Sequence, residues 1–122
     1  MYFPVDLWFR AFLLTVIVEV PIVAFLLRRF EPSRPRLLLL ILFANLASHP
    51  PVWFIFTQLF LVGTTAYLVA AEGWAVAAEA LFYWAAFRGL PVRRAIVVAL
   101  AANAASFVVG QLVSGAWPDL LS

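Results

Sequence analysis

Four long apolar segments dominate this chain of 122 residues, and they cover residues 11–27, 37–57, 65–87 and 95–113. The hydrocarbon core of a bilayer requires about 20 apolar residues per helix, with a range of about 17 to 25. Hydrophobic residues make up 66% of the sequence and charged residues 11%, so a soluble domain of this composition could not cover itself with polar groups. The sequence therefore predicts an all-α, polytopic membrane protein with four transmembrane helices surrounded by the lipid bilayer.

The connections and the charges predict how these helices are arranged. Short connections make consecutive helices antiparallel, which predicts an up-down four-helix bundle forming one transmembrane domain over residues 1–122. The first helix is expected to begin after Asp6 as its N-cap. Seven of the eight basic residues, all Arg, follow the first or the third predicted helix. The positive-inside rule then places these two loops in the cytoplasm and both termini outside it, in a plasma membrane such as the bacterial inner membrane. Because the Arg residues form no continuous stripe, nucleic acid is not an expected partner.

Polar residues recur at a fixed distance from the two Arg-rich loops. Four of them lie nine positions from an Arg of these loops: Glu19, Asn45, Glu79 and Asn103. The two Asn residues, the only ones in the chain, stand in the similar segments ANLAS and ANAAS. Coincidence within a restricted Leu, Ala and Val alphabet is one explanation. We favour duplication of a helix hairpin, with halves 6–57 and 65–115 related as parallel repeats, an arrangement common in transporters.

Helix geometry predicts that these four residues form one polar layer. A rise of 1.5 Å per residue places them all about 12 to 14 Å inside the edge that carries the Arg residues. An ionised carboxylate at this depth costs about 2.5 to 3.5 kcal/mol, whereas an interhelical hydrogen bond returns about 0.6 to 2 kcal/mol. We therefore expect the carboxyl groups to face one another inside the bundle, with at least one protonated or with a cation between them. Helical spacing adds further polar side chains, so the expected ion-binding or polar core is Glu19, Asn45, Ser48, His49, Glu79, Asn103 and Ser106.

Proline distinguishes the two halves. Pro21, Pro50 and Pro51 lie inside the first two predicted helices, and the second half has no Pro at the matching positions. Proline removes a backbone donor and kinks a helix, which predicts kinks at Pro21 and at Pro50–Pro51. The freed carbonyl groups beside Glu19 and His49 could supply oxygen ligands to a cation or water. A plain kink without a ligand is the alternative.

Several other residues are candidates for supporting roles. Glu72 lies two turns from Glu79 on the same face, where it lines an access path or is solvated at the outer mouth. Tyr83, one turn after Glu79, is placed beside that path and either hydrogen-bonds Glu79 or anchors the interface. Thr15 is expected to bond back to its own helix. A ridge of small residues predicts close helix packing, within the bundle or in an oligomer: Ala102, Ser106, Gly110 and Ser114.

Three functions remain open from the sequence. The first is a proton- or cation-binding transport protein in which Glu19 and Glu79 bind the cation, the two Asn residues orient them and His49 relays protons. The second is a non-catalytic subunit or assembly protein of a larger membrane complex, with the polar layer as interhelical glue. The third is an intramembrane metal-dependent or lipid-modifying enzyme, in which Glu19, His49 and Glu79 hold a metal ion.

The first two functions are favoured over an enzyme because no familiar catalytic motif is present. A bound cation is the one cofactor that the sequence suggests. A bundle of this size leaves little room for a permeation path, so a homo-oligomer or a larger membrane complex is expected.

Overall fold

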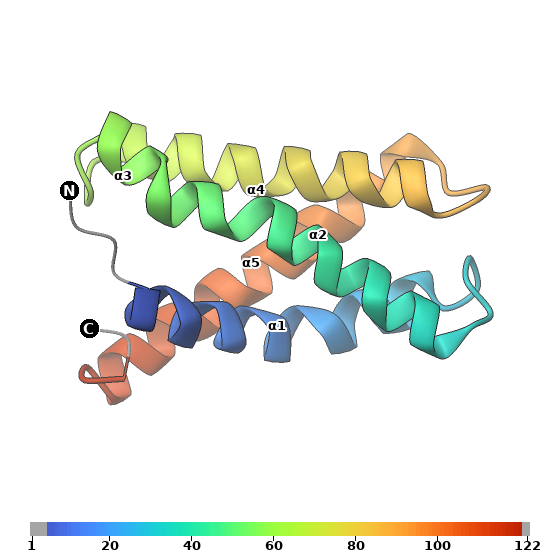
Figure 1. Cartoon of the computed structure of the whole chain (residues 1–122), viewed down its shortest axis with the longest axis horizontal. Helices are drawn as coiled ribbons and strands as arrows, with labels where there is room; N and C mark the ends of the chain where they lie inside the picture. The colour runs from blue at the N-terminus through green and yellow to red at the C-terminus, as the bar shows by residue number, and fades with distance from the viewer. Residues whose placement is uncertain (1–4, 121–122) are drawn as a thin grey trace.

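The structure is a computed structural model that describes residues 5–120, and all regular secondary structure in this range is helical. Its five helices are α1 (Val5–Leu27), α2 (Arg34–Phe54), α3 (Phe56–Leu59), α4 (Thr65–Ala86) and α5 (Val92–Ala116). The four long helices run up and down side by side, with the one-turn α3 at the end of α2 (Figure 1). The prediction of an all-α chain is confirmed.

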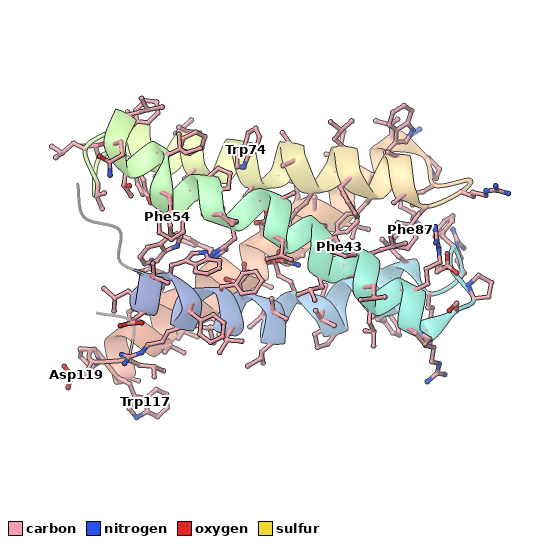
Figure 2. All side chains as sticks on the ribbon, viewed as in Figure 1. Phe43, Phe54, Trp74, Phe87, Trp117 and Asp119 are labelled. Atoms are coloured by element: carbon pink, nitrogen blue, oxygen red, sulfur yellow. The ribbon has the colours of Figure 1, made fainter. Side chains whose placement is uncertain are left out.

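Three of these helical segments are long and apolar enough to cross a membrane: Val5–Leu27, Arg34–Leu59 and Val92–Ala116. Helix α4 has 22 residues but carries both Glu72 and Glu79, and it does not belong to this set. The expected fourth span is therefore less apolar than the other three. Large apolar side chains cover the outer surface, including Phe43 and Trp117, which are 53% and 65% exposed (Figure 2). Such a surface suits lipid rather than water.

The long helices form a ring in the order α1, α2, α4, α5. Each helix packs against its two neighbours in this order, and the contact between α5 and α1 closes the ring. Helices α1 and α4 are therefore diagonal partners across the centre, as are α2 and α5. The loops after α1 and α4, which carry Arg residues, lie at one end of the bundle, opposite the beginning of α1, the end of α5 and α3 (Figure 1). We call these the Arg-loop end and the terminus end.

Helix boundaries differ from the sequence prediction in local ways. Asp6 lies inside the first turn of α1, so it is not the expected N-cap. Helix α2 begins three residues early because Ser33 caps it, its hydroxyl accepting a bond from the Arg36 backbone N–H (3.4 Å). Arg36 also pairs with Glu31 through a 3.0 Å salt bridge that crosses this turn. Helix α5 likewise begins early, at Val92, because Pro91 supplies its N-cap in an extended conformation.

The proline residues do not end their helices. Helix α1 continues through Pro21, and α2 continues through Pro50 and Pro51 as far as Phe54. The break comes at Ile55, whose N–H still donates to the Pro51 carbonyl (3.0 Å) before α3 begins. The predicted kinks at Pro21 and Pro50–Pro51 stay predictions.

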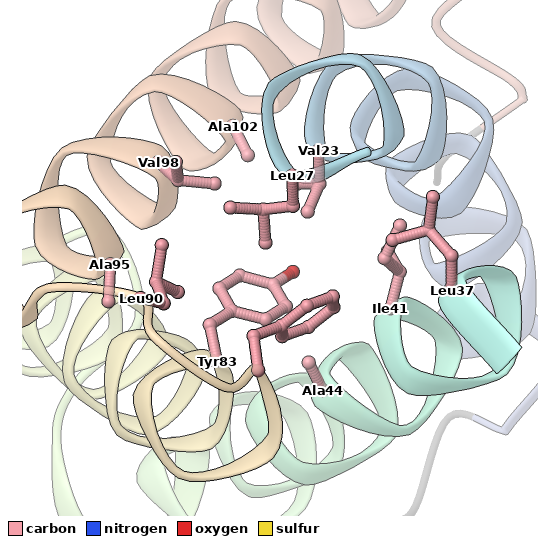
Figure 3. Close-up of a cluster of buried hydrophobic side chains, with 11 residues drawn as sticks. Val23, Leu27, Leu37, Ile41, Ala44, Tyr83, Leu90, Ala95, Val98 and Ala102 are labelled. Carbon is pink, nitrogen blue, oxygen red and sulfur yellow. The ribbon is translucent and has the colours of Figure 1, made fainter. Parts of the chain in front are cut away.

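An apolar cluster fills the Arg-loop half of the bundle. Side chains from all four long helices converge there around Tyr83 (Figure 3). Tyr83 stacks edge-on against Phe87 with ring centroids 6.0 Å apart. We refer to the following residues as the apolar plug: Val23, Leu27, Leu37, Ile41, Ala44, Tyr83, Phe87, Leu90, Ala95, Val98 and Ala102.

Candidate functional site

Two glutamates meet at the centre of the bundle. Glu19 of α1 is 1% exposed and Glu79 of α4 is 0% exposed. Although α1 and α4 are diagonal helices that do not pack against each other, the two carboxyl groups lie within hydrogen-bonding range of one another. The ion pair formed within residues 5–120 joins Arg36 to Glu31 in a loop, so neither buried glutamate has a basic partner there. A carboxyl group can donate to another carboxyl group only when it carries a proton.

Asn103 holds one member of this pair. Its side-chain amide donates both to Glu79 Oε2 and to the Ala99 carbonyl (2.8 Å). In the first hairpin, the Asn45 amide donates to the Ile41 carbonyl (3.0 Å), while Asn45 Oδ1 has no hydrogen-bond partner within residues 5–120. Asn103 is therefore placed to orient its glutamate as the sequence predicted, and Asn45 is not.

The serines that follow the two asparagines make matching bonds. Ser48 Oγ donates to the Asn45 carbonyl (3.3 Å), and Ser106 Oγ donates to the Asn103 carbonyl (3.1 Å). In both hairpins, the Asn amide group therefore donates to the carbonyl four residues earlier, and the Ser hydroxyl donates to the carbonyl three residues earlier. The hydroxyl groups are turned toward their own helices, because a Ser three residues after another residue can reach that residue's carbonyl.

His49 lies on the terminus side of the polar layer. Its Nε2 atom is 3.3 Å from Thr15 Oγ1, and its ring packs edge-on against Phe12 with centroids 5.6 Å apart. Thr15 therefore contacts the neighbouring helix α2, a contact that the expectation of a bond within its own helix overlooked. His49 Nδ1 is buried and has no partner in the described part of the chain.

The sequence also suggested a metal ion held by Glu19, His49 and Glu79. Within residues 5–120, no three His, Asp or Glu side chains come together closely enough to hold a metal ion. Glu19, His49 and Glu79 therefore do not form such a group among the described residues, and a bound metal ion stays a prediction. The physical reason is that His49 is directed at Thr15 and Phe12, so its ring does not complete a ligand set with the carboxyl pair.

A cavity of about 170 Å³ lies beside the carboxyl pair. Seven of its lining residues are polar: Thr15, Glu19, Ser48, His49, Glu72, Asn103 and Ser106. Since a water molecule takes up about 30 Å³ in the liquid, a few waters fit. Glu72 is only partly buried, and it also lines a shallow groove between α4 and α5 together with Leu68 and Phe107.

Buried polar atoms without partners cluster around this cavity and the carboxyl pair. Within residues 5–120 they include Glu19 Oε1, Asn45 Oδ1, His49 Nδ1, Glu79 Oε1 and Tyr83 Oη. Leaving one such atom unsatisfied costs about 1 to 3 kcal/mol. Native proteins usually satisfy these atoms with water or an ion. The centre therefore has the hydrogen-bonding capacity to bind water, a proton or a small cation.

One of the supporting predictions needs correction, and two others stay predictions. Tyr83 does not hydrogen-bond Glu79, since its hydroxyl has no partner in the described residues and its ring belongs to the apolar plug. Its place beside an access path stays a prediction. In the small-residue ridge, Ala102 is buried and Ser106 is half-buried. Ser114 is exposed, and a Cβ atom added at Gly110 would meet no atom within 4 Å among residues 5–120. Packing of this half of the ridge in an oligomer stays a prediction.

Sequence reasoning missed the role of Trp74. Its indole Nε1 donates to the Ser48 carbonyl (3.1 Å), which ties α4 to α2 beside the polar layer (Figure 2). Tyr67 adds a second link of this kind, from its hydroxyl to the Val52 carbonyl (3.4 Å). The available signal was position: Trp74 stands well inside its helix, away from the ends where Trp anchors an interface, so its N–H requires an internal partner.

Comparison of this chain with family models, with curated proteins and with solved structures finds no match. The assignment of a function therefore depends on the geometry of the polar layer alone.

Proposed function

We propose that this chain is a small membrane protein whose Glu19–Glu79 pair binds and releases a proton, at the centre of a proton-coupled transport activity. The observation that supports the proposal is the meeting of two fully buried carboxyl groups from diagonal helices, with no basic partner among residues 5–120. Two adjacent carboxylates at this depth would repel each other and lack solvation. One shared proton removes one charge and supplies the hydrogen bond between them.

A proton fits this centre better than a metal ion does. Metal ions such as Ca²⁺ need six or more oxygen ligands, and Zn²⁺ needs three or four protein ligands. The pair itself offers only the carboxyl groups of Glu19 and Glu79, and His49 is turned away toward Thr15. A proton requires only the two oxygens that face each other.

The position of the pair gives proton binding a mechanical consequence. Glu19 belongs to the hairpin α1–α2 and Glu79 to the hairpin α4–α5. Protonation lets the two carboxyl groups attract each other, whereas loss of the proton makes them repel. The protonation state therefore shifts the balance between a closed and a more open arrangement of the two hairpins, which is the kind of two-state change that transport requires.

The setting in the membrane completes the proposal. The positive-inside rule places the Arg-loop end in the cytoplasm and the terminus end outside. One bundle with a cavity of about 170 Å³ has little room for a complete path, so the proposal includes association with a second copy or with a larger membrane complex.

Infrared difference spectra between acidic and alkaline pH test the proton site directly, because a protonated carboxyl group shows a C=O stretch that a carboxylate lacks. Wild-type protein in lipid should show this band titrating. Glu19→Gln and Glu79→Gln should each alter or abolish it, while the control Glu31→Gln, in the loop salt bridge, should leave it unchanged. An unchanged band in both core variants would refute the proposal.

Interhelical hydrogen bonding supports a second candidate, in which the polar layer serves only as structural glue in a subunit of a larger complex. Asn103 ties α5 to α4, and Trp74 ties α4 to α2. In that case Glu79→Gln would lower thermal stability without any change in a titrating band. Co-purification of the wild-type chain with a fixed larger partner would favour this second function.

A further inference from the structure

The polar layer divides the bundle into two halves of opposite character. On α1, Thr15 and Glu19 line the cavity, whereas Val23 and Leu27 further along belong to the apolar plug. On α4, too, the cavity residues lie toward the terminus end and the plug residues toward the Arg-loop end. Ala71, Glu72 and Ala75, near the terminus end, line the cavity, and Tyr83 and Phe87, near the Arg-loop end, belong to the plug.

The other two helices divide at the same level. On α2, Ala44 belongs to the plug and His49 lines the cavity. On α5, Ala102 belongs to the plug and Ser106 lines the cavity. Every residue that lines the cavity thus lies at the polar layer or on its terminus side, and every residue of the plug lies on its Arg-loop side.

The plug is closely packed. Val23, Leu27, Ile41, Ala44 and Tyr83 are each 0% exposed, and their side chains fill the centre of the bundle (Figure 3). The Tyr83 hydroxyl is the one side-chain polar group among the plug residues. A packed apolar region of this kind contains no chain of hydrogen-bonding groups along which water or protons could move.

The cavity side has the opposite properties. Glu19 is 1% exposed and its Oε1 atom has no partner among the described residues. His49, whose Nδ1 atom also has none there, lines the same cavity. Glu72, only partly buried, lines both this cavity and the groove between α4 and α5. The titratable groups around the carboxyl pair are His49 from α2 and Glu72 and Tyr83 from α4, and the nearest polar group from α5 is the uncharged Asn103.

We propose that the cavity is an aqueous vestibule that connects the carboxyl pair to the terminus side of the membrane alone, with the apolar plug closing the path to the Arg-loop side. This inference rests on the proposed function, to which it adds a direction: in this conformation the pair exchanges its proton with one side. Exchange with the other side requires the plug to open.

Cysteine labelling tests the vestibule, because the natural chain contains no Cys. Ser106→Cys places a thiol in the cavity, and Val98→Cys places one in the plug on the same helix, eight residues away. A charged, membrane-impermeant thiol reagent is added to sealed membrane vesicles of either sidedness. Arg88→Cys and Val62→Cys, both exposed, mark the Arg-loop side and the terminus side in the same assay.

The expected result is that Ser106→Cys reacts only in vesicles where Val62→Cys reacts, and that Val98→Cys reacts in neither. Reaction of Ser106→Cys from the Arg-loop side would overturn the inference. Failure of Ser106→Cys to react from either side, while a membrane-permeant maleimide labels it, would overturn it as well. Ser48→Cys, from α2, provides a second cavity position if Ser106→Cys fails to fold.

The labelling experiment can fail independently of the proposed function, and the two failures can be told apart. These variants keep Glu19 and Glu79, and the readout is the access of a reagent rather than a proton. One-sided labelling together with an infrared band unaffected by Glu19→Gln and Glu79→Gln would leave a vestibule without a proton site. A titrating band without one-sided labelling would leave a proton site without this vestibule.

Discussion

The hairpins α1–α2 and α4–α5 carry the same polar residues but connect them differently. Each has a Glu, an Asn and a Ser, and both Asn–Ser pairs make equivalent bonds to their own backbones. Only in α4–α5 does the Asn also hold the Glu, through Asn103 and Glu79. In α1–α2, Glu19 Oε1 and Asn45 Oδ1 have no partner within residues 5–120, and His49 has no counterpart, since Phe107 stands at the matching position.

The difference indicates a division of roles between two similar hairpins. The second hairpin fixes its carboxyl group in place with an amide donor. The first hairpin presents its carboxyl group to the cavity next to a histidine, with no amide donor among the described residues. If the hairpins arose by duplication, as we propose, one copy kept the supporting bond and the other acquired an open site.

The largest expected effect concerns the dependence of stability on pH. At low pH the pair carries protons and its two carboxyl groups attract each other. As pH rises and both ionise, two like charges are left buried, while the unfolded chain ionises freely in water, so the free energy of unfolding falls. We expect a loss on the order of 2.5 to 3.5 kcal/mol, the cost of an ionised carboxylate at mid-membrane. Thermal unfolding in detergent, followed across pH, measures it.

Glu19→Gln sharpens this prediction, because it leaves one carboxyl group and adds an amide donor beside it. The fall in stability at high pH should then be much smaller than in the wild type. Glu31→Gln, whose carboxyl group lies in a loop salt bridge, should keep the wild-type fall. A wild-type pH profile in Glu19→Gln would show that the two carboxyl groups do not interact.

An intermediate effect distinguishes the two asparagines. Asn103→Leu removes the donor to Glu79 and leaves a buried carboxyl group unsatisfied, which should lower the free energy of unfolding by about 1 to 3 kcal/mol. Asn45→Leu removes only a bond to the Ile41 carbonyl, so about 0.5 to 1.5 kcal/mol is expected. Both variants are compared by thermal unfolding at one pH. Equal losses, or a larger loss for Asn45→Leu, would contradict the difference between the hairpins.

Residue spacing alone predicted much of the fold. The apolar runs located all four long helices, and the spacing of Glu and Asn from the Arg loops placed Glu19 and Glu79 at one level. These features follow from the fixed rise of an α-helix and from the cost of exposing a carboxylate to lipid. The helix positions and the level of the two glutamates can therefore be predicted without knowing which side chains contact one another.

The pairing of side chains could not be predicted in this way. Asn45 and Asn103 have the same spacing and the same local sequence, yet only Asn103 reaches a carboxyl group. The helix faces that contain them were predictable, but the choice of rotamer and partner depends on the packing of all four helices. For the same reason spacing could not reveal that His49 contacts Thr15, or that Tyr83 faces the plug.

The smallest expected effect concerns the ridge of small residues, which only the second hairpin carries, because Val52 stands where the repeat would match Gly110. An added Cβ at Gly110 meets no atom within 4 Å in this bundle. Gly110→Ala should therefore leave the stability of the monomer unchanged or raise its free energy of unfolding by about 0.5 to 1 kcal/mol, since Ala loses less entropy than Gly in a helix.

If a second copy packs closely against this ridge, the same substitution should weaken self-association, measured by sedimentation in detergent. Val52→Ala, at the matching position of the first hairpin, is the control and should leave self-association unchanged. Weaker association in both variants would show that the effect is not specific to the second hairpin. A destabilised Gly110→Ala monomer would show that the ridge packs within the bundle rather than against a second copy.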